Sequence, residues 1–328
     1  MYVTGGKQRK SLLELKEWVM FEAGMVLEVD PAAHCVQPRL EYVSPPEALP
    51  DEGGGTLFKA GAVVDGRFYV CTSTEVLIYE APDFAPAGYL SLPCFQDLHH
   101  ACPTPDGTLL VVSTGLDLVL ETTPEGRVLR EWSALGGDPW QRFSRAIDYR
   151  KVASTKPHAS HPNYAFLLED EVWVTRFAQR DAICLTAPQE PIHIDIERPH
   201  DGILQGDSIY FTTVNGWVVI ADRRTRAIQK AVDLNQIANP EQLILGWCRG
   251  VLPVDGRYAW VGFSRIRPTK FQENLRWMRS GFRPYEKPTR IALCDLEEQA
   301  ILQEIDLEPY GLNSVFSILP ADDPLVNL

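Results

Sequence analysis

The sequence predicts an all-β protein, a six-bladed β-propeller, and three observations lead to that prediction. One short pattern recurs along the chain: a polar or basic residue precedes an Asp-containing turn, which is followed by a strand of β-branched and aromatic residues. The repeats have a period of roughly 35–45 residues, with turn signals about every 8–12 residues, as is typical of propeller blades. Strand signals without neighbours lie at both ends of the chain. Pairing the two ends would close the ring and remove open sheet edges.

The repeated pattern is clearest in the stretch from Asp97 to Val112, where two histidines precede an Asp-Gly turn and an apolar run. The same order recurs around the Asp65-Gly66 and Asp255-Gly256 turns, each of which leads into a strand signal. Five such units can be assigned inside the chain. They cover about residues 56–93, 98–132, 162–196, 201–234 and 247–307.

The two ends of the chain are expected to complete each other. Strand signals at residues 25–29 and 39–43 have no inner strand before them, and residues 312–319 form an inner-type strand with no partner after it. We therefore expect residues 25–328 to form a single propeller domain. Residues 1–24 are expected to be an N-terminal tail and a short helix.

The predicted tail and helix differ in character. Residues 1–10 are polar, which predicts a frayed end. Ser11-Leu12-Leu13-Glu14 has the order of a capping box and predicts an amphipathic helix that continues to about Met20.

Two long insertions interrupt the repeats, at about residues 134–160 and 264–288. Long loops inside a compact domain are commonly lids or binding loops. Both insertions are rich in Arg and Trp, so we expect Arg145, Arg265 and Trp277 to hold an anionic or aromatic group of a substrate near the channel mouth. The alternative is a solvated loop in which Arg stems pack on aromatic rings.

The composition limits the class of protein. Hydrophobic residues make up 45% and charged residues 23% of the chain, and no apolar run is long enough to span a bilayer. The net charge of −13 argues against nucleic acid and anionic membranes as partners, because both require a basic surface. Seven cysteines without a C-x-x-C pair, and no secretion signal, indicate a reduced, cytoplasmic protein. No oligomeric state is indicated.

The residues that open the units are the main functional candidates. The first strand of each blade lines the central channel, so equivalent residues should converge on the axis. These residues are Lys59, His100, His161, His200, Arg249 and Asn313. Three neutral imidazoles on one axis can bind a divalent transition metal such as Fe, Cu, Zn or Mn, and they leave positions open for a substrate. Either His99 or His100 could face the channel, and we favour His100.

We expect a metal-dependent enzyme that acts on a small, anionic molecule. His100, His161 and His200 would be the metal ligands, and Lys59 and Arg249 would hold the substrate or stabilise developing negative charge. Asp201 is a further catalytic candidate, as a base or as the group that orients a histidine. Asn313 is assigned to substrate binding.

The residues leave the reaction open. Iron or copper in this site would suit oxygen chemistry and an oxidoreductase, whereas zinc or manganese would suit a lyase or hydrolase. One alternative is a metal-free enzyme in which a ring histidine is the general base and Arg249 binds the anion. Another is a non-enzymatic scaffold that binds a protein through the insertions.

The segments around Arg249–Arg267 and His100–Asp117 resemble bacterial propeller proteins of unknown function. Over residues 25–320 the layout is also similar to that of the six-bladed propellers of gluconolactonases, NHL-type proteins and strictosidine synthase. The Glu/Asn/Asp calcium site of gluconolactonases has no counterpart here, so this resemblance implies the architecture alone. The seven-bladed carotenoid oxygenases offer an analogy for the site, because they hold iron on the propeller axis with histidines.

Overall fold

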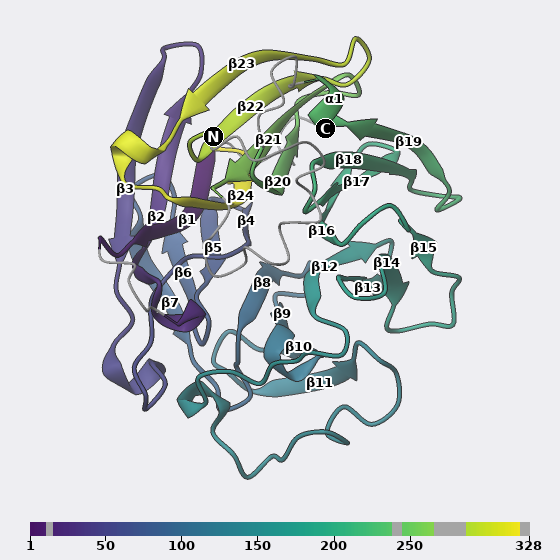
Figure 1. Cartoon of the computed structure of the whole chain (residues 1–328). Helices are drawn as coiled ribbons and strands as arrows, with labels where there is room; N and C mark the ends of the chain where they lie inside the picture. Colours follow the sequence, from purple (N-terminus) through teal and green to yellow (C-terminus); the bar gives the residue numbers. More distant parts are fainter. Residues whose placement is uncertain (11–15, 238–244, 266–286, 322–328) are drawn as a thin grey trace.

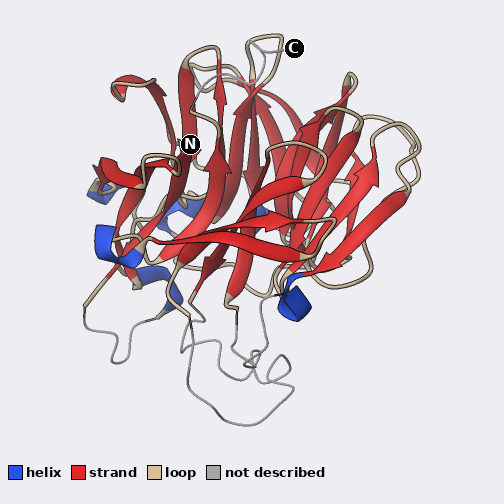
Figure 2. Ribbon diagram, turned by 90° about the horizontal axis from the view of Figure 1, so that it is seen from above, coloured by secondary structure: helices blue, strands red, loops and turns tan. Residues whose placement is uncertain are grey.

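The computed structural model describes residues 1–10, 16–237, 245–265 and 287–321. Over these residues the chain forms six antiparallel sheets of four strands each, arranged as the blades of a propeller (Figures 1 and 2). The predicted all-β six-bladed fold is therefore confirmed. The described part contains no helix that is long and apolar enough to cross a membrane.

Each blade has one inner strand, and these strands surround the centre of the molecule (Figure 1). The inner strands are β24 (Ser314–Leu319), β4 (Gly61–Val64), β8 (Leu98–Pro103), β12 (Pro162–Leu168), β16 (Pro199–Gln205) and β20 (Trp247–Pro253). Each contacts the inner strand of the next blade, and β24 contacts both β20 and β4, so the ring is closed.

The other strands follow the inner strand of each blade outward. The second strands are β1 (Tyr2–Gln8), β5 (Arg67–Cys71), β9 (Leu109–Ser113), β13 (Glu171–Arg176), β17 (Ser208–Thr213) and β21 (Tyr258–Ser264). The third strands are β2 (Phe21–Asp30), β6 (Val76–Glu80), β10 (Leu118–Thr122), β14 (Asp181–Cys184), β18 (Trp217–Asp222) and β22 (Arg290–Asp295). The outer strands are β3 (Cys35–Tyr42), β7 (Ala85–Leu90), β11 (Val128–Ser133), β15 (Ile192–His193), β19 (Ile228–Asp233) and β23 (Ala300–Asp306).

Helical segments in the described residues are short. They are the 3-10 turns η1 (Glu17–Val19), η2 (Pro46–Ala48), η3 (Thr114–Leu116), η4 (Tyr149–Lys151) and η6 (Glu308–Tyr310), and the single-turn helix α1 (Leu234–Ile237). Of the predicted N-terminal helix, residues 11–15 lie outside the described residues, and the described remainder contains only η1.

The blade that closes the ring contains both ends of the chain. Strand β24 is its inner strand and pairs antiparallel with β1, with Val3 opposite Ile318. The prediction that residues 1–10 are a frayed tail is wrong, because Tyr2–Gln8 is a strand whose first five residues are buried. A Cβ at Gly5 would overlap the carbonyl oxygen of Ser314, so the close approach of β1 to β24 requires glycine.

The core lies between neighbouring blades. Strand β9 is buried along its whole length, because other blades cover both faces of its sheet. Its run Leu109–Val112 is therefore continuously apolar and does not alternate, which is the pattern of a strand buried on both sides. Each such side chain contributes roughly 1.5–3 kcal/mol of burial free energy.

Candidate metal centre at the propeller axis

A cavity of about 770 Å³ lies where several inner strands begin. It is lined by His99 near the start of β8, His200 in β16, Trp247 and Arg249 in β20, and by residues of the loops that lead into the inner strands. Its volume is within the range of small-molecule sites, about 300–1,000 Å³. The convergence of several blades on one cavity makes it the candidate functional site.

One wall of the cavity is a chain of polar contacts between blades. The Lys59 ammonium donates a hydrogen bond to Asp97 Oδ1 and forms an ion pair with it. The His99 ring lies beside this pair, with Nδ1 2.8 Å from the backbone carbonyl oxygen of Asp97. A carbonyl oxygen can only accept, so His99 Nδ1 carries the hydrogen and Nε2 keeps its lone pair.

The charges in this wall follow from burial and proximity. Burial lowers the pKa of Lys59, although the Asp97 carboxylate opposes this effect. Burial by itself would raise the pKa of Asp97, but the Lys59 ammonium and then His99 hold it well below its usual value. Asp97 is therefore an ionised, partly buried carboxylate and a strong acceptor.

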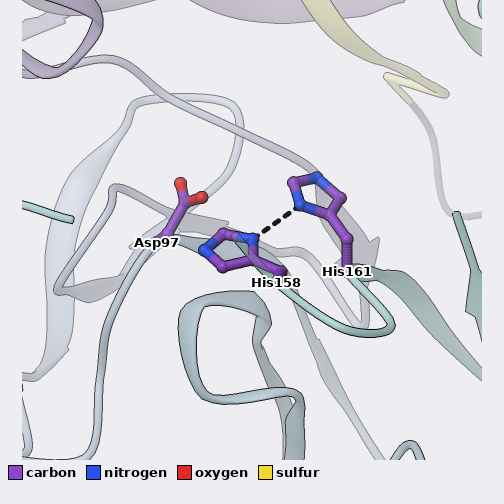
Figure 3. A group of neighbouring side chains, drawn as sticks. All are labelled: Asp97, His158 and His161. Carbon is purple, nitrogen blue, oxygen red and sulfur yellow. Dashed lines mark hydrogen bonds between the residues drawn. The ribbon is translucent and has the colours of Figure 1, made fainter. Parts of the chain in front are cut away.

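Asp97, His158 and His161 form a possible metal-binding group on this wall (Figure 3). Their ligand atoms all lie within 4.8 Å of one another. The two Nδ1 atoms of the histidines are 2.7 Å apart and share a hydrogen bond. Nitrogen ligands about 2.0–2.1 Å from a tetrahedral metal ion are roughly 3.3 Å apart, so a small opening of the pair would admit an ion in place of the shared hydrogen.

Thr155 orients His158 within this group. The Thr155 hydroxyl donates to the carbonyl oxygen of Gly115, 2.5 Å away, and lies 3.3 Å from His158 Nε2. With its hydrogen used in this way, the hydroxyl accepts from His158 Nε2–H, which leaves the lone pair of His158 on Nδ1. A second ring nitrogen held in this manner is typical of metal-binding histidines.

The loop that carries both histidines is anchored by Asp117, whose side chain is only 2% exposed. Its carboxylate accepts hydrogen bonds from the backbone N–H groups of Ala159, Ser160 and His161 at 3.0, 2.9 and 2.8 Å. Arg142 also donates to the same carboxylate. The end of the 134–160 insertion is thus fixed to the end of η3, and this contact sets the position of His161.

The histidines of this wall are neutral, as metal ligands must be. Burial lowers the pKa of His158 and lowers the pKa of His99 and His161 well below the usual value. Neighbouring cations contribute, including Lys59 near His99 and Lys156 near His158. A neutral imidazole can offer its lone pair to a metal ion without first losing a proton.

The adjoining wall consists of aromatic rings and guanidinium groups, and it begins at Phe177, whose ring centroid lies 4.9 Å from that of His161. The rings of Phe177 and Trp247 are nearly parallel, with an interplanar angle of 12° and centroids 6.5 Å apart. The His200 ring lies 5.5 Å from Phe177 and 6.2 Å from Trp247. The Arg249 guanidinium lies over Phe316, 3.9 Å from the ring centroid, and over Trp247 at 5.7 Å.

The described lining of the cavity is strongly basic. Its basic residues are Lys59, Lys156, Arg180, Arg198, Arg249 and Arg265, and its one acidic residue is Asp97. Arg180 and Arg265 have acidic partners outside the lining, Glu197 and Glu308. The excess of positive charge is notable because the whole chain carries a net charge of −13.

The structure brings several predicted site residues together. Lys59, His161, His200, Arg249 and Arg265 all line the cavity. His200 is separated from the Asp97 group by Phe177, so the three predicted ligands do not form one metal site.

His99 lines the cavity and His100 does not, although the sequence favoured His100. The His100 ring stacks on Tyr164, with centroids 3.6 Å apart, and its Nδ1 accepts a hydrogen bond from the Ala165 N–H. Burial lowers its pKa to about 3. The reason is a register shift between Leu98 and His100 in the pairing of β8 with β9, which turns His99 toward the axis.

Asp201, predicted as a catalytic residue, also lies outside the cavity lining. Its buried carboxylate accepts hydrogen bonds from the Thr212 hydroxyl at 2.5 Å and from the Gly250 N–H at 3.1 Å. These contacts join the blades of β17 and β20. Burial raises its pKa to about 6.

The predicted substrate-binding residues are scattered. Arg145 pairs with Glu131 and stacks on Trp140 outside the cavity. Asn313 accepts a hydrogen bond from the Gln8 N–H and helps to close the ring, so it does not line the cavity either. Trp277, with most of the 264–288 insertion, lies outside the described residues.

Three cavity residues were missed from the sequence: Asp97 as a ligand, His158 and Phe177. His158 precedes His161 by three residues inside the flagged 134–160 insertion, so the His-x-x-His spacing was an available signal. The sequence suggested Asp97 as a base or as an orienting group, but not as a metal ligand. Phe177 follows the end of β13 and carried no signal that separates it from a core residue.

The chain matches no protein-family model, and no curated protein matches it. Among solved structures, a Bacteroides caccae protein of unknown function has a TM-score of 0.60 at 12% identity, covering 98% of this chain and 99% of that one. The virginiamycin B lyase of Staphylococcus aureus has a TM-score of 0.50 at 11% identity, covering 93% and 89%. A streptogramin B lyase has a TM-score of 0.52 at 12% identity, covering 91% and 83%.

A histidine-to-alanine variant of the S. aureus lyase is catalytically inactive and was solved with quinupristin. At these identities the likenesses show a shared fold and not a shared activity. The expected resemblance to bacterial propellers of unknown function is confirmed as a likeness of fold. The chain is thus a six-bladed propeller similar in fold to a lyase, with a possible Asp/His/His metal-binding group in the wall of its cavity.

Proposed function

We propose that the cavity is the active site of a metal-dependent lyase or hydrolase that acts on a small anionic molecule. The observation that carries the proposal is the grouping of Asp97, His158 and His161 within 4.8 Å on the cavity wall. Two imidazoles and one carboxylate are a common protein ligand set for zinc, manganese or non-haem iron, and they leave positions open for substrate. The bound ion would act as a Lewis acid on a substrate oxygen.

The basic lining supports an anionic substrate. Arg249 and Arg198 are held over aromatic rings of the cavity wall, where each guanidinium can meet a negative group of the substrate. Low dielectric strengthens such contacts, because the cavity is partly enclosed by protein. The substrate would therefore be bound with its negative group on the side away from Asp97.

His99 is suited to accept a proton from the substrate. Its Nδ1–H is held by the Asp97 carbonyl, so the lone pair on Nε2 is available, and burial keeps the ring neutral by lowering its pKa. In an elimination, Nε2 would take a proton from carbon while the bonding electrons move to form the double bond and expel the leaving group. The fold shared with lyases, one of which depends on a histidine, is consistent with this chemistry.

Metal content tests the proposal. Protein purified without an affinity tag would be loaded anaerobically with Zn²⁺, Mn²⁺ or Fe²⁺ and analysed by elemental mass spectrometry. We expect about one ion per chain, with at least tenfold weaker retention in His158→Ala and His161→Ala. His193→Ala is the matched control, because His193 is exposed on the outer strand β15 and should leave the metal content unchanged.

Absence of metal after loading, or equal loss in the His193→Ala control, would contradict the metal site. A metal-free acid–base enzyme would then be the better-supported function. His99 favours that second candidate, since its fixed tautomer does not depend on an ion. The same protein tested with and without a chelator separates the two, because only the metal-dependent enzyme loses activity.

A further inference from the structure

Two opposite sides of the cavity have different chemistry. The inner strands contact one another around the ring in the order β4, β8, β12, β16, β20 and β24, so β4 and β16 belong to opposite blades. Leu57 lies in the segment that leads into β4, Arg198 immediately precedes β16, and both line the cavity. The metal group lies between these two sides, because Asp97 immediately precedes β8 and His161 immediately precedes β12.

The side next to β4 is an apolar end of the cavity. Its apolar lining comes from η1, the start of β2 and the loop before β4, and consists of Trp18, Phe21, Leu49, Pro50 and Leu57. Phe21 is buried and the other four are half-buried. A Cβ added to Gly54 would meet Pro50 Cδ at 2.8 Å and Leu49 Cδ2 at 3.1 Å, and the next residue, Gly55, donates its N–H to the Trp18 carbonyl oxygen at 2.6 Å. These contacts bring the apolar residues together.

The cavity lining is continuous from this apolar end to the metal group. The Lys151 ammonium donates a hydrogen bond to the carbonyl oxygen of Leu49 at 3.1 Å, which fixes the start of the following segment beside the apolar end. Residues 152–154 and 156–158 of that segment line the cavity, and the segment ends at His158. A molecule bound at the apolar end can therefore reach the metal group without leaving the cavity.

The side next to β16 is a cationic end. The Arg198 guanidinium lies 5.3 Å from the ring centroid of Phe177, which is itself 4.9 Å from that of His161. In the part of the chain that the structure describes, Arg198 forms no ion pair, whereas Arg180 in the same lining pairs with Glu197 at 3.7 Å. One aromatic ring thus separates a candidate metal ligand from a cation that a negative group of a ligand can neutralise.

We infer that the substrate is an amphipathic anion that spans the cavity, with a hydrocarbon part against Trp18, Leu49 and Leu57 and a negative group at Arg198. The inference rests on the proposed function for the reacting bond, which would lie between the two ends, beside the metal group. It adds the chemistry of both ends. A small anion without a hydrocarbon part would leave the apolar end in contact with water, and a neutral molecule would leave Arg198 without an anion.

Isothermal titration calorimetry with acetate, butanoate, octanoate and the neutral octanamide tests this inference. We expect the affinity to rise roughly threefold for each methylene group between butanoate and octanoate, because each is removed from water. Octanoate should bind at least tenfold more tightly than octanamide. A further probe, 4-phenylbutanoate, identifies the hydrocarbon: tighter binding than octanoate would indicate an aryl group, and binding between butanoate and octanoate would indicate an alkyl chain.

Variants assign each end of the probe to its side of the cavity. Leu57→Ser should reduce the gain in affinity for each methylene group and leave acetate binding unchanged, and Leu49→Ser is a second variant with the same expected effect. Arg198→Met should weaken all carboxylates by the same factor, at least fivefold, without changing the gain for each methylene group. Leu302→Ser and Arg130→Met are the matched controls, since Leu302 is 55% exposed on β23 and the Arg130 side chain is 67% exposed on β11. Thermal melts would show that each variant is folded.

Equal binding of butanoate and octanoate, or of octanoate and octanamide, would overturn the inference. A gain for each methylene group that stays the same in both Leu57→Ser and Leu49→Ser would also overturn it. Titrations of metal-loaded and metal-stripped protein separate the two proposals. Affinity that rises with chain length in protein that takes up no metal would support the amphipathic anion and contradict the metal centre, whereas stoichiometric metal with equal affinity for acetate and octanoate would do the reverse.

Discussion

At the scale of single residues, the site depends on which of two adjacent histidines faces the cavity. His99 and His100 are neighbours in one strand, yet His99 lines the cavity and His100 stacks on Tyr164 between blades. A regular strand turns neighbouring side chains to opposite faces, so the alternation was predictable. The choice between the two faces was not, because it follows from a register shift that arises only when β8 pairs with β9.

Asp201 illustrates a structural role for a residue that the sequence assigned to catalysis. Its carboxylate is the acceptor for the Thr212 hydroxyl and the Gly250 N–H. In Asp201→Ala both donors lose their acceptor, and we expect the free energy of unfolding to fall by about 1–3 kcal/mol at pH 8. In Asp201→Asn the amide oxygen can still accept, and the buried charge is gone, so stability should match or exceed that of the wild type.

Thermal melts of both Asp201 variants, with metal content measured beside them, check this prediction. Both variants should retain the metal, because Asp201 does not line the cavity. Loss of metal from a well-folded Asp201→Asn protein would contradict the structural role. It would return Asp201 to the site that the sequence suggested.

At the scale of elements, the 134–160 insertion is held in place by one buried carboxylate. Asp117, at the end of η3, accepts from three successive backbone N–H groups that end at His161. In Asp117→Asn an NH₂ group replaces one of these acceptor oxygens and meets backbone donors, so the loop should lose its fixed position. We expect metal affinity to fall roughly 10–100-fold, the usual effect of removing a group that supports metal ligands.

Competition titration with a chromophoric chelator measures that change. Asp148→Asn is the matched control, because Asp148 lies in the same insertion and accepts from the Arg150 N–H without touching His158 or His161. Unchanged affinity in Asp117→Asn, or an equal fall in both variants, would show that the anchor does not set the ligand geometry.

The elements of the fold could be predicted more fully than the site. Apolar runs such as Leu109–Val112 after an Asp-Gly turn identify a blade, because turn chemistry and burial are both local properties of the sequence. The position of Lys59, His161, His200 and Arg249 at the start of each repeated unit is also a local property, and all four line the cavity. The metal group required knowledge of a loop conformation, since His158 enters the cavity from an insertion and not from a strand start.

Errors at the N-terminus had a different origin. Tyr2–Gln8 reads as polar and glycine-rich, but its pairing partner β24 lies more than 300 residues later in the chain. Strand propensity reflects packing against neighbours, and these neighbours are not visible in a local window. The sequence showed that strands at the two ends of the chain lacked partners. It did not show that Tyr2–Gln8 is itself a strand of the blade that closes the ring.

At the scale of the whole molecule, acid should destabilise the fold through its buried and partly buried histidines. Burial lowers the pKa of five of them. They are His99, His100, His158, His161 and His200. As the pH falls through 6.5, these residues take up protons more readily in the unfolded chain than in the folded one, so the free energy of unfolding falls as the pH falls.

The size of the effect can be bounded with His100, whose folded pKa is about 3. On going from pH 8 to pH 5, His100 alone should lower the free energy of unfolding by about 2 kcal/mol. Asp201 acts in the opposite direction, because its pKa is raised to about 6 and the folded chain takes up its proton first. Over the same pH range, Asp201 should raise the free energy of unfolding by about 1 kcal/mol. This increase is smaller than the decrease caused by the five histidines together.

Melting temperatures of the metal-stripped protein at pH 8 and pH 5 test this prediction, and His100→Phe is the informative variant. Phenylalanine can keep a ring against Tyr164 but cannot be protonated in either state. We expect the variant to be less stable at pH 8, because the Ala165 N–H loses its acceptor, and to lose less stability than the wild type on going to pH 5. If the melting temperature falls equally in both proteins between pH 8 and pH 5, then the fold does not hold His100 neutral. The same conclusion would then apply to the neutral state assigned to the histidines of the cavity wall.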